Sequence, residues 1–174
     1  MRRIAFFPRG WMILEAMTIL VATCVLISTN VPAWADTPWQ RAGLKGIKEV
    51  EVVVEDMSPD AEKDGLTRDQ LQSDVEMRLR KAGIRVTSGA AAFLYVIAHP
   101  MKHPRGFYAY SIHVMVEEMV SLERDPSISL VGTTWRSTGG VGIVGVKVLK
   151  SLRDRVSDQV DEFINAYFDQ NPKR

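Results

Sequence analysis

A pair of alternating apolar runs on either side of a short turn places the tightest constraint on the fold. The first run covers residues 107–123 and the second covers residues 128–138, with the turn-forming residues Arg124–Ser127 between them. Two runs joined in this way predict a β-hairpin. The alternation of the first run becomes irregular at Glu117 and Glu118, which indicates a local bulge.

The two faces of this hairpin differ in kind. One set of alternate positions suits a core covered by helices: Tyr108, Tyr110, Ile112, Val114 and Val116. The opposite set is too apolar for an ordinary solvated face: Phe107, Ala109, Ser111, His113, Met115 and Glu117. We therefore look for a functional surface on the second set. Two alternatives remain open: the second set is the core, or residues 36–46 fold over it.

Pairing across the turn extends this second set into a strip. With Leu122 opposite Ile128, Met115 faces Trp135 further along the hairpin, and Met119 faces Val131. An apolar strip rimmed by polar groups often marks contact with a partner or a lipid. The predicted partner- or ligand-binding residues, all on the sheet face away from the helices, are therefore Phe107, Met115, Met119, Val131 and Trp135.

The first 35 residues have the three parts of a secretory signal peptide. A basic start is followed by an apolar run at residues 16–28 and by a cleavage site of the Ala-x-Ala kind that ends at Ala35. We expect cleavage between Ala35 and Asp36, and an exported protein that is periplasmic or extracellular. An uncleaved N-terminal anchor is the alternative. A lipid on Cys24 is disfavoured, because Thr23 precedes this cysteine.

Removal of this segment would limit the reactive groups and change the net charge of the remaining chain. It takes away Cys24, the single cysteine, and with it any disulfide or thiolate chemistry. It also takes away three arginines and one glutamate, so the formal net charge changes from +1 to −1. A nearly neutral chain offers no strong electrostatic attraction for nucleic acid. We expect no transmembrane span in the mature chain.

The clearest helix signal lies at residues 67–82. Thr67 and Gln70 have the spacing of a capping box, and Leu66 and Leu71 that of a hydrophobic staple. Apolar residues then recur at helical spacing as far as Gly83, which is a typical C-terminal cap. A second amphipathic helix is predicted from residue 146 to about residue 169, after a glycine-rich loop at residues 139–145.

These elements predict a two-layer α+β sandwich. Alternating valine and glutamate at residues 48–57 predicts a half-buried strand, and the apolar run at residues 93–98 predicts a buried one. The element order is then β-α-β-β-β-α, with two helices on one face of a four-stranded, mostly antiparallel sheet. The expected domains are a signal peptide at 1–35, a linker at 36–46 and a single α+β domain at 47–170.

No motif predicts catalysis, a metal or a cofactor. Gly140, Gly142 and Gly145 match the spacing of a dinucleotide fingerprint, but no strand follows the next helix to hold the ribose. His99 and His103 could act as zinc ligands, although the prolines beside them favour a solvent-facing loop. We therefore expect a protein that is not an enzyme, without catalytic residues, metal ligands or cofactors.

The order of elements resembles that of the outer-membrane lipopolysaccharide-assembly lipoproteins and is similar to that of the N-terminal domain of TolB-type periplasmic proteins. The stretch at residues 65–84 also resembles one in small exported bacterial proteins of unassigned function. The resemblance implies docking or scaffolding at the cell envelope. Our first functional hypothesis is a non-enzymatic envelope module that binds an envelope protein or a lipid through its exposed sheet face or edge strand. The second is a carrier that holds a small molecule or a lipid between sheet and helices.

Overall fold

The computed structural model describes residues 37–172. The predicted signal peptide, its cleavage site and Cys24 lie outside these residues. Six strands are present: β1 (Glu49–Val54), β2 (Arg85–Val86), β3 (Ala92–His103), β4 (Phe107–Leu122), β5 (Asp125–Arg136) and β6 (Gly140–Gly145). The helices are α2 (Pro38–Gly43), α3 (Pro59–Lys63), α4 (Arg68–Ala82), the 3₁₀ helix η1 (Val146–Ser151) and α5 (Leu152–Gln170).

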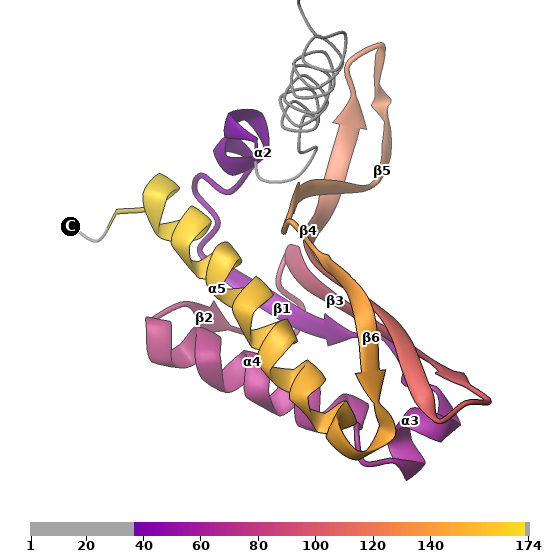
Figure 1. Cartoon of the computed structure of the whole chain (residues 1–174). Helices are drawn as coiled ribbons and strands as arrows, with labels where there is room; N and C mark the ends of the chain where they lie inside the picture. Colours follow the sequence, from indigo (N-terminus) through magenta and orange to yellow (C-terminus); the bar gives the residue numbers. More distant parts are fainter. Residues whose placement is uncertain (1–36, 173–174) are drawn as a thin grey trace, which may run out of the picture. The chain divides into compact units, whose positions relative to one another are not determined.

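All six strands belong to one mixed sheet in the order β2-β1-β3-β4-β5, and β6 also pairs with β4 (Figure 1). β1 is parallel to both β2 and β3. The pairs β3–β4, β4–β5 and β4–β6 are antiparallel. The connection from β1 to β3 contains α4, as a crossover between parallel strands requires.

Strand β4 organises this sheet because it is long enough for two strands on one edge. β3 pairs with residues 107–118 along one edge of β4. On the opposite edge, β6 pairs with residues 107–112 and β5 with residues 115–122. The hairpin predicted from the sequence is therefore present as β4 and β5, and its first strand also pairs with β6.

The predicted four-stranded, mostly antiparallel sheet is wrong, although the broad α+β class is correct. The predicted loop at residues 139–145 contains β6, whose glycines hid the alternation of its valines and isoleucine. Glycine weakens a strand by itself, so the segment forms a strand here because pairing with β4 supplies its backbone hydrogen bonds. The parallel pairing of β1 with β2 and with β3 was also missed, because it depends on contacts distant in sequence.

The local signals for α4 are confirmed. Thr67 is the N-cap, and its hydroxyl accepts a hydrogen bond from the Gln70 backbone N–H at 3.3 Å. Gly83 ends the helix with a φ of 90°, a left-handed conformation that glycine adopts without a Cβ penalty. One face of α4, consisting of Leu71, Val75 and Leu79, is buried.

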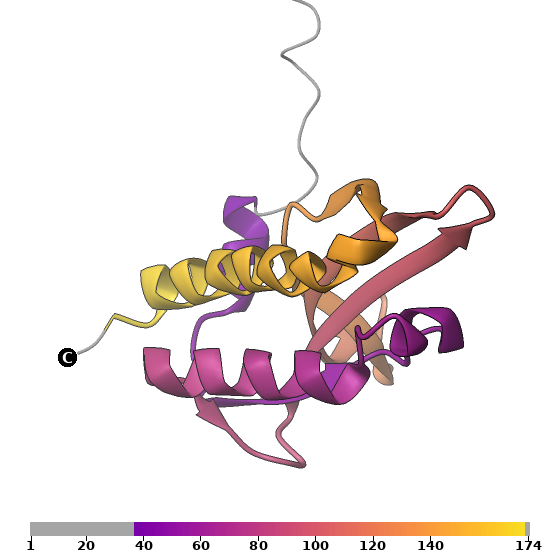
Figure 2. The ribbon, with the colours of Figure 1, turned by 60° about the horizontal axis from the view of Figure 1, so that its bottom comes forward.

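The core lies between the sheet and the two long helices, α4 and α5, which run side by side over one sheet face (Figure 2). The predicted core side of β4 is confirmed: Tyr108, Ile112, Val114 and Val116 are buried, and Tyr110 is half-buried against the core. α5 adds six buried residues at helical spacing: Leu152, Val156, Val160, Phe163, Ala166 and Tyr167.

Residues 36–46, predicted to be a linker, contain the short helix α2. Thr37 caps it by accepting a hydrogen bond from the Gln40 backbone N–H. Leu44, just beyond the helix, is fully buried in the core. The Asn171 side chain donates to the Leu44 carbonyl at 2.8 Å, so this segment is tied to the C-terminal end of α5.

A polar cluster attaches α3 to the sheet. The Asp64 carboxylate, just after α3, accepts hydrogen bonds from Lys102 of β3 and from the hydroxyl of Tyr108 of β4, both at 2.7 Å. These two donors lower the pKa of Asp64, the Lys102 ammonium most strongly. The carboxylate also raises the pKa of Lys102.

We predict that Asp64→Asn destabilises the protein at neutral pH and that this loss disappears in acid. Because the folded-state pKa of Asp64 is lowered, its stabilisation is present above the unfolded-state pKa of about 4 and is lost as the pH falls through the folded-state value. Urea unfolding at a series of pH values will test this. Asp60→Asn is the control, since the Asp60 carboxylate lies 3.9 Å from the Lys102 amine and is largely exposed. A difference between wild type and Asp64→Asn that does not change with pH would contradict the prediction.

Candidate functional site

The candidate site is the face of the sheet opposite α4 and α5, which we call the outer face. Its rows follow from the strand register, because residues directly opposite in neighbouring strands project to the same face. Three rows cross the sheet: Val53 with Tyr95 and Met115, His99 with Ser111 and Val141, and Met101 with Ala109 and Ile143.

Apolar side chains dominate this face and several of them are strongly exposed. The exposed fractions are 74% for Met101, 80% for Val141 and 72% for Ile143. Phe93, Tyr95 and Ile97 of β3 are only half-buried on the same face. Within residues 37–172, α4 and α5 pack on the opposite face, so no long helix covers these side chains.

Charged groups stand among the apolar residues at the β1 side. His99 Nε2 lies 2.6 Å from Glu55 Oε2. Burial raises the pKa of Tyr95, and the negative charges of Glu55 and Glu117 raise it further. The outer face therefore combines an apolar centre with ionisable groups at its rim.

Four of the five predicted binding residues project away from the core, and one does not. Phe107 is half-buried and stacks on His103, with 4.4 Å between ring centroids. Met115 lines a hollow of about 370 Å³ with Gln40, Thr133 and Arg136. Met119 and Val131 oppose each other as predicted and are exposed by 62% and 53%. Trp135 is fully buried.

A bulge explains the position of Trp135. The register of β4 and β5 shifts between Val116 and Glu117, so that Glu117 pairs with Thr133 while Val116 pairs with Trp135. Thr134 is the extra residue, and its hydroxyl donates to Glu118 at 2.8 Å. The sequence indicated a bulge at Glu117 and Glu118 of β4, whereas the extra residue lies opposite them on β5. The predicted pairing of Met115 with Trp135 allowed for no bulge and was wrong by one residue. A shift of one residue moves a side chain to the other face of a sheet.

Sequence analysis missed the most exposed part of the outer face. Val141 and Ile143 alternate with Gly140, Gly142 and Gly145, so the stretch resembled a loop. Their alternation was the signal that could have identified a strand. Val148 is an exposed neighbour of this part of the face. One of its methyl groups lies 3.9 Å from the position that a Cβ atom on Gly145 would occupy.

The three histidines do not converge. His99 contacts Glu55, His103 stacks on Phe107, and the ring of His113 lies under Gly139. Among residues 37–172, no group of three or more histidine, cysteine, aspartate or glutamate side chains is placed to hold a metal ion.

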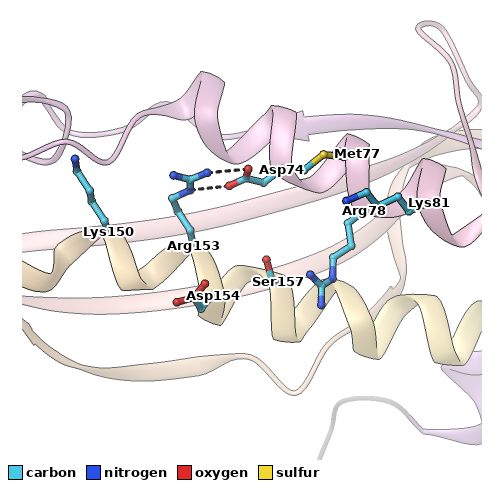
Figure 3. A pocket seen from close by; sticks show the side chains of 8 residues that line it. All are labelled: Asp74, Met77, Arg78, Lys81, Lys150, Arg153, Asp154 and Ser157. Carbon is cyan, nitrogen blue, oxygen red and sulfur yellow. Dashed lines mark hydrogen bonds and ion pairs between the residues drawn. The ribbon is translucent and has the colours of Figure 1, made fainter.

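A second hollow, of about 300 Å³, lies between α4 and α5 and is lined mostly by charged side chains (Figure 3). Two ion pairs cross between the helices beside it. Arg153 donates two hydrogen bonds to Asp74, at 2.7 and 2.8 Å, and Arg78 donates two to Asp161. These carboxylates raise the pKa values of both arginines. The arginines therefore join the two helices, and their donors are already bound to protein carboxylates.

None of the helices in the described part of the chain has both the length and the apolar run needed to cross a bilayer.

Comparisons with known proteins add one structural similarity. No protein-family model matches the chain, and no curated protein matches it. Among solved structures, the chain is similar to a dodecamer of a PelC point variant from Paraburkholderia phytofirmans, with a TM-score of 0.34 and 15% sequence identity. The similarity covers 65% of this chain and 86% of that chain.

We predict that Trp135→Ala costs about 3–5 kcal/mol of unfolding free energy, because it leaves a large cavity against Phe163 in the core. Met119→Ala removes an exposed side chain of the same hairpin and should change the free energy by less than about 1 kcal/mol. Urea unfolding followed by circular dichroism measures both values. Similar losses for the two variants would mean that Trp135 is not a core residue.

Proposed function

We propose that this chain is a non-enzymatic binding module of the cell envelope, whose partner docks on the outer face of the sheet. The observation that carries the proposal is the apolar, uncovered surface around Met101, Val141 and Ile143. Burial of apolar area drives most protein association, and contiguous exposed apolar patches on monomers commonly mark such contacts.

The arrangement of the site supports binding rather than chemistry. Catalysis by a side chain needs an acid, base or nucleophile with partners that orient it. On the outer face the ionisable groups stand apart, and His99 with Glu55 is the single close histidine–carboxylate pair that we find in residues 37–172. Both members are partly exposed. Ser111 lies opposite His99 in the neighbouring strand, but its place in the sheet register alone does not orient it as a nucleophile.

The assignment to the cell envelope rests on the sequence. The first 35 residues have the basic start, apolar run and cleavage site of an export signal. A partner in the periplasm or at a membrane surface, either an envelope protein or a lipid, follows from this prediction.

The carrier hypothesis has less support. A carrier needs an internal volume for its ligand, whereas the side chains between sheet and helices pack together in one hydrophobic cluster. The two hollows described above open at the surface, one between α4 and α5 and one beside Met115. We therefore retain the outer face as the proposed site.

We predict that the double variant Val141→Ser, Ile143→Ser keeps its stability and loses its partner. Both side chains are exposed, so their replacement should change the unfolding free energy by less than about 1 kcal/mol. The measurement compares what co-purifies with the full-length chain expressed in its own host, by quantitative mass spectrometry. A specific partner or lipid should fall about tenfold or more, which corresponds to the loss of roughly 1.4 kcal/mol of binding free energy.

The matched control is Met77→Ser on α4, which removes an exposed apolar side chain from the helical layer. It should retain the partner at the wild-type level. Equal retention by all three proteins, or no specific partner with wild type, would contradict a docking role for the outer face.

A further inference from the structure

Acidic residues are confined to one end of the outer face. Glu51 and Glu117 lie on either side of Phe93, near the start of β3. Glu55 extends furthest along the strands, where its carboxylate lies 2.6 Å from His99. Beyond this pair, toward the turn between β3 and β4, neither of these two strands contains an acidic residue.

The opposite end of the outer face combines basic with apolar residues. It consists of residues 101–107, which include the turn between β3 and β4, and residues 143–148, which include the end of β6; we call it the basic tip. The two segments are neighbours, because Phe107 pairs with Gly145. They contain no acidic residue, and their basic residues are Lys102, His103, Arg105 and Lys147. In the rest of residues 37–172, acidic residues outnumber lysine and arginine.

Two of the fixed positive charges of the basic tip are available to a ligand. Lys102 is not, because its amine donates to the Asp64 carboxylate at 2.7 Å. Asp60 lies 3.9 Å from the same amine, so these carboxylates offset Lys102 and not the other two basic groups. Arg105 and Lys147 are exposed, and neither forms an ion pair within residues 37–172.

Strongly exposed apolar side chains lie among these charges. Met101 and Ile143 flank Ala109 in one row of the outer face and are 74% and 72% exposed. Val148 is 57% exposed. The turn between β3 and β4 extends past the ends of α4 and α5 (Figure 2), so the long helices do not shield the basic tip.

Hydrogen bonds hold the turn of the basic tip in one conformation. The Gly106 N–H donates to the His103 carbonyl at 3.0 Å, and Gly106 has a φ of 81°, in the left-handed region that suits glycine. The Arg105 N–H donates to His103 Nδ1 at 3.2 Å. The backbone that carries Arg105 is therefore ordered before binding, which lowers the entropic cost of a contact there.

We propose that the basic tip docks on the surface of a phospholipid bilayer that contains anionic lipids. This inference rests on the proposed function and narrows its partner to a lipid surface. Met101, Ile143 and Val148 enter the headgroup region, while the side chains of Arg105 and Lys147 contact lipid phosphates. Binding to such a surface gains from buried apolar area and from attraction between basic side chains and anionic headgroups.

Charge complementarity favours this occupant and this orientation. A lysine or arginine close to an anionic bilayer strengthens binding roughly fivefold, and the attraction falls off within a Debye length. Contact through the basic tip keeps Glu51 and Glu117 at the far end of the strands, away from the negative surface. Contact through the whole outer face would press these carboxylates against it, so the separation of charges along the strands selects the tip.

The test is co-sedimentation of the full-length chain, as purified from its own host, with vesicles of two compositions. One is phosphatidylcholine alone, and the other is equal parts of phosphatidylcholine and phosphatidylglycerol. Wild type should bind the anionic vesicles more tightly, and added salt should reduce the difference by screening the charges. The double variant Arg105→Glu, Lys147→Glu should bind the anionic vesicles about tenfold or more weakly than wild type.

The matched control is Lys45→Glu, Arg124→Glu, which makes the same charge change at two exposed residues outside the basic tip. It should bind near the wild-type level and unfold in urea like the first variant. All three proteins share the N-terminal segment, so a difference between the variants cannot come from it. The proposal is overturned if wild type binds both vesicles alike or binds neither, or if the two double variants bind alike.

The co-purification experiment separates this inference from the proposed function. If Val141→Ser, Ile143→Ser loses a specific protein while wild type binds no vesicles, the lipid assignment fails and a docking role for the outer face stands. If wild type has no specific partner and binds no vesicles, both proposals fail.

Discussion

The structure depends on the backbone pairing of β4, a 16-residue strand that holds three other strands. At about 3.3 Å per residue such a strand is longer than the two helices can cover on one face. Its first two-thirds carry the core residues from Tyr108 to Val116, and its last third continues into the hairpin. The exposed apolar surface around Val141 and Ile143 arises from this length, because β6 pairs with the part of one β4 edge that β5 leaves open.

The bulge at Thr134 separates the two regions of the sheet. On one side of it, Trp135 points into the core and packs against Phe163, with ring centroids 5.5 Å apart. On the other side, Met119 and Val131 face each other in the exposed end of the hairpin. A single extra residue therefore decides whether an apolar side chain of β5 stabilises the fold or is available for binding.

Much of the fold could be predicted from local sequence. The capped helix α4, the stripe of α5, the hairpin and the core side of β4 all follow from periodicity and capping within one element. The pairing of Met119 with Val131 was also predicted correctly, although the turn beside it was not. Leu122 pairs with Asp125 and not with Ile128, because the register shifts between Ser121 and Leu122. These features depend on residues close together in the chain.

Only the tertiary structure decided the rest. The parallel pairing of β1 with β2 and β3, the strand at residues 140–145 and the buried position of Trp135 all require partners far away in sequence. β6 pairs with the first half of β4, and the position of this edge could not be read from the alternation of residues 140–145 alone. The outer face around Val141 and Ile143 exists for the same reason, so this exposed apolar surface came from the pairing of strands.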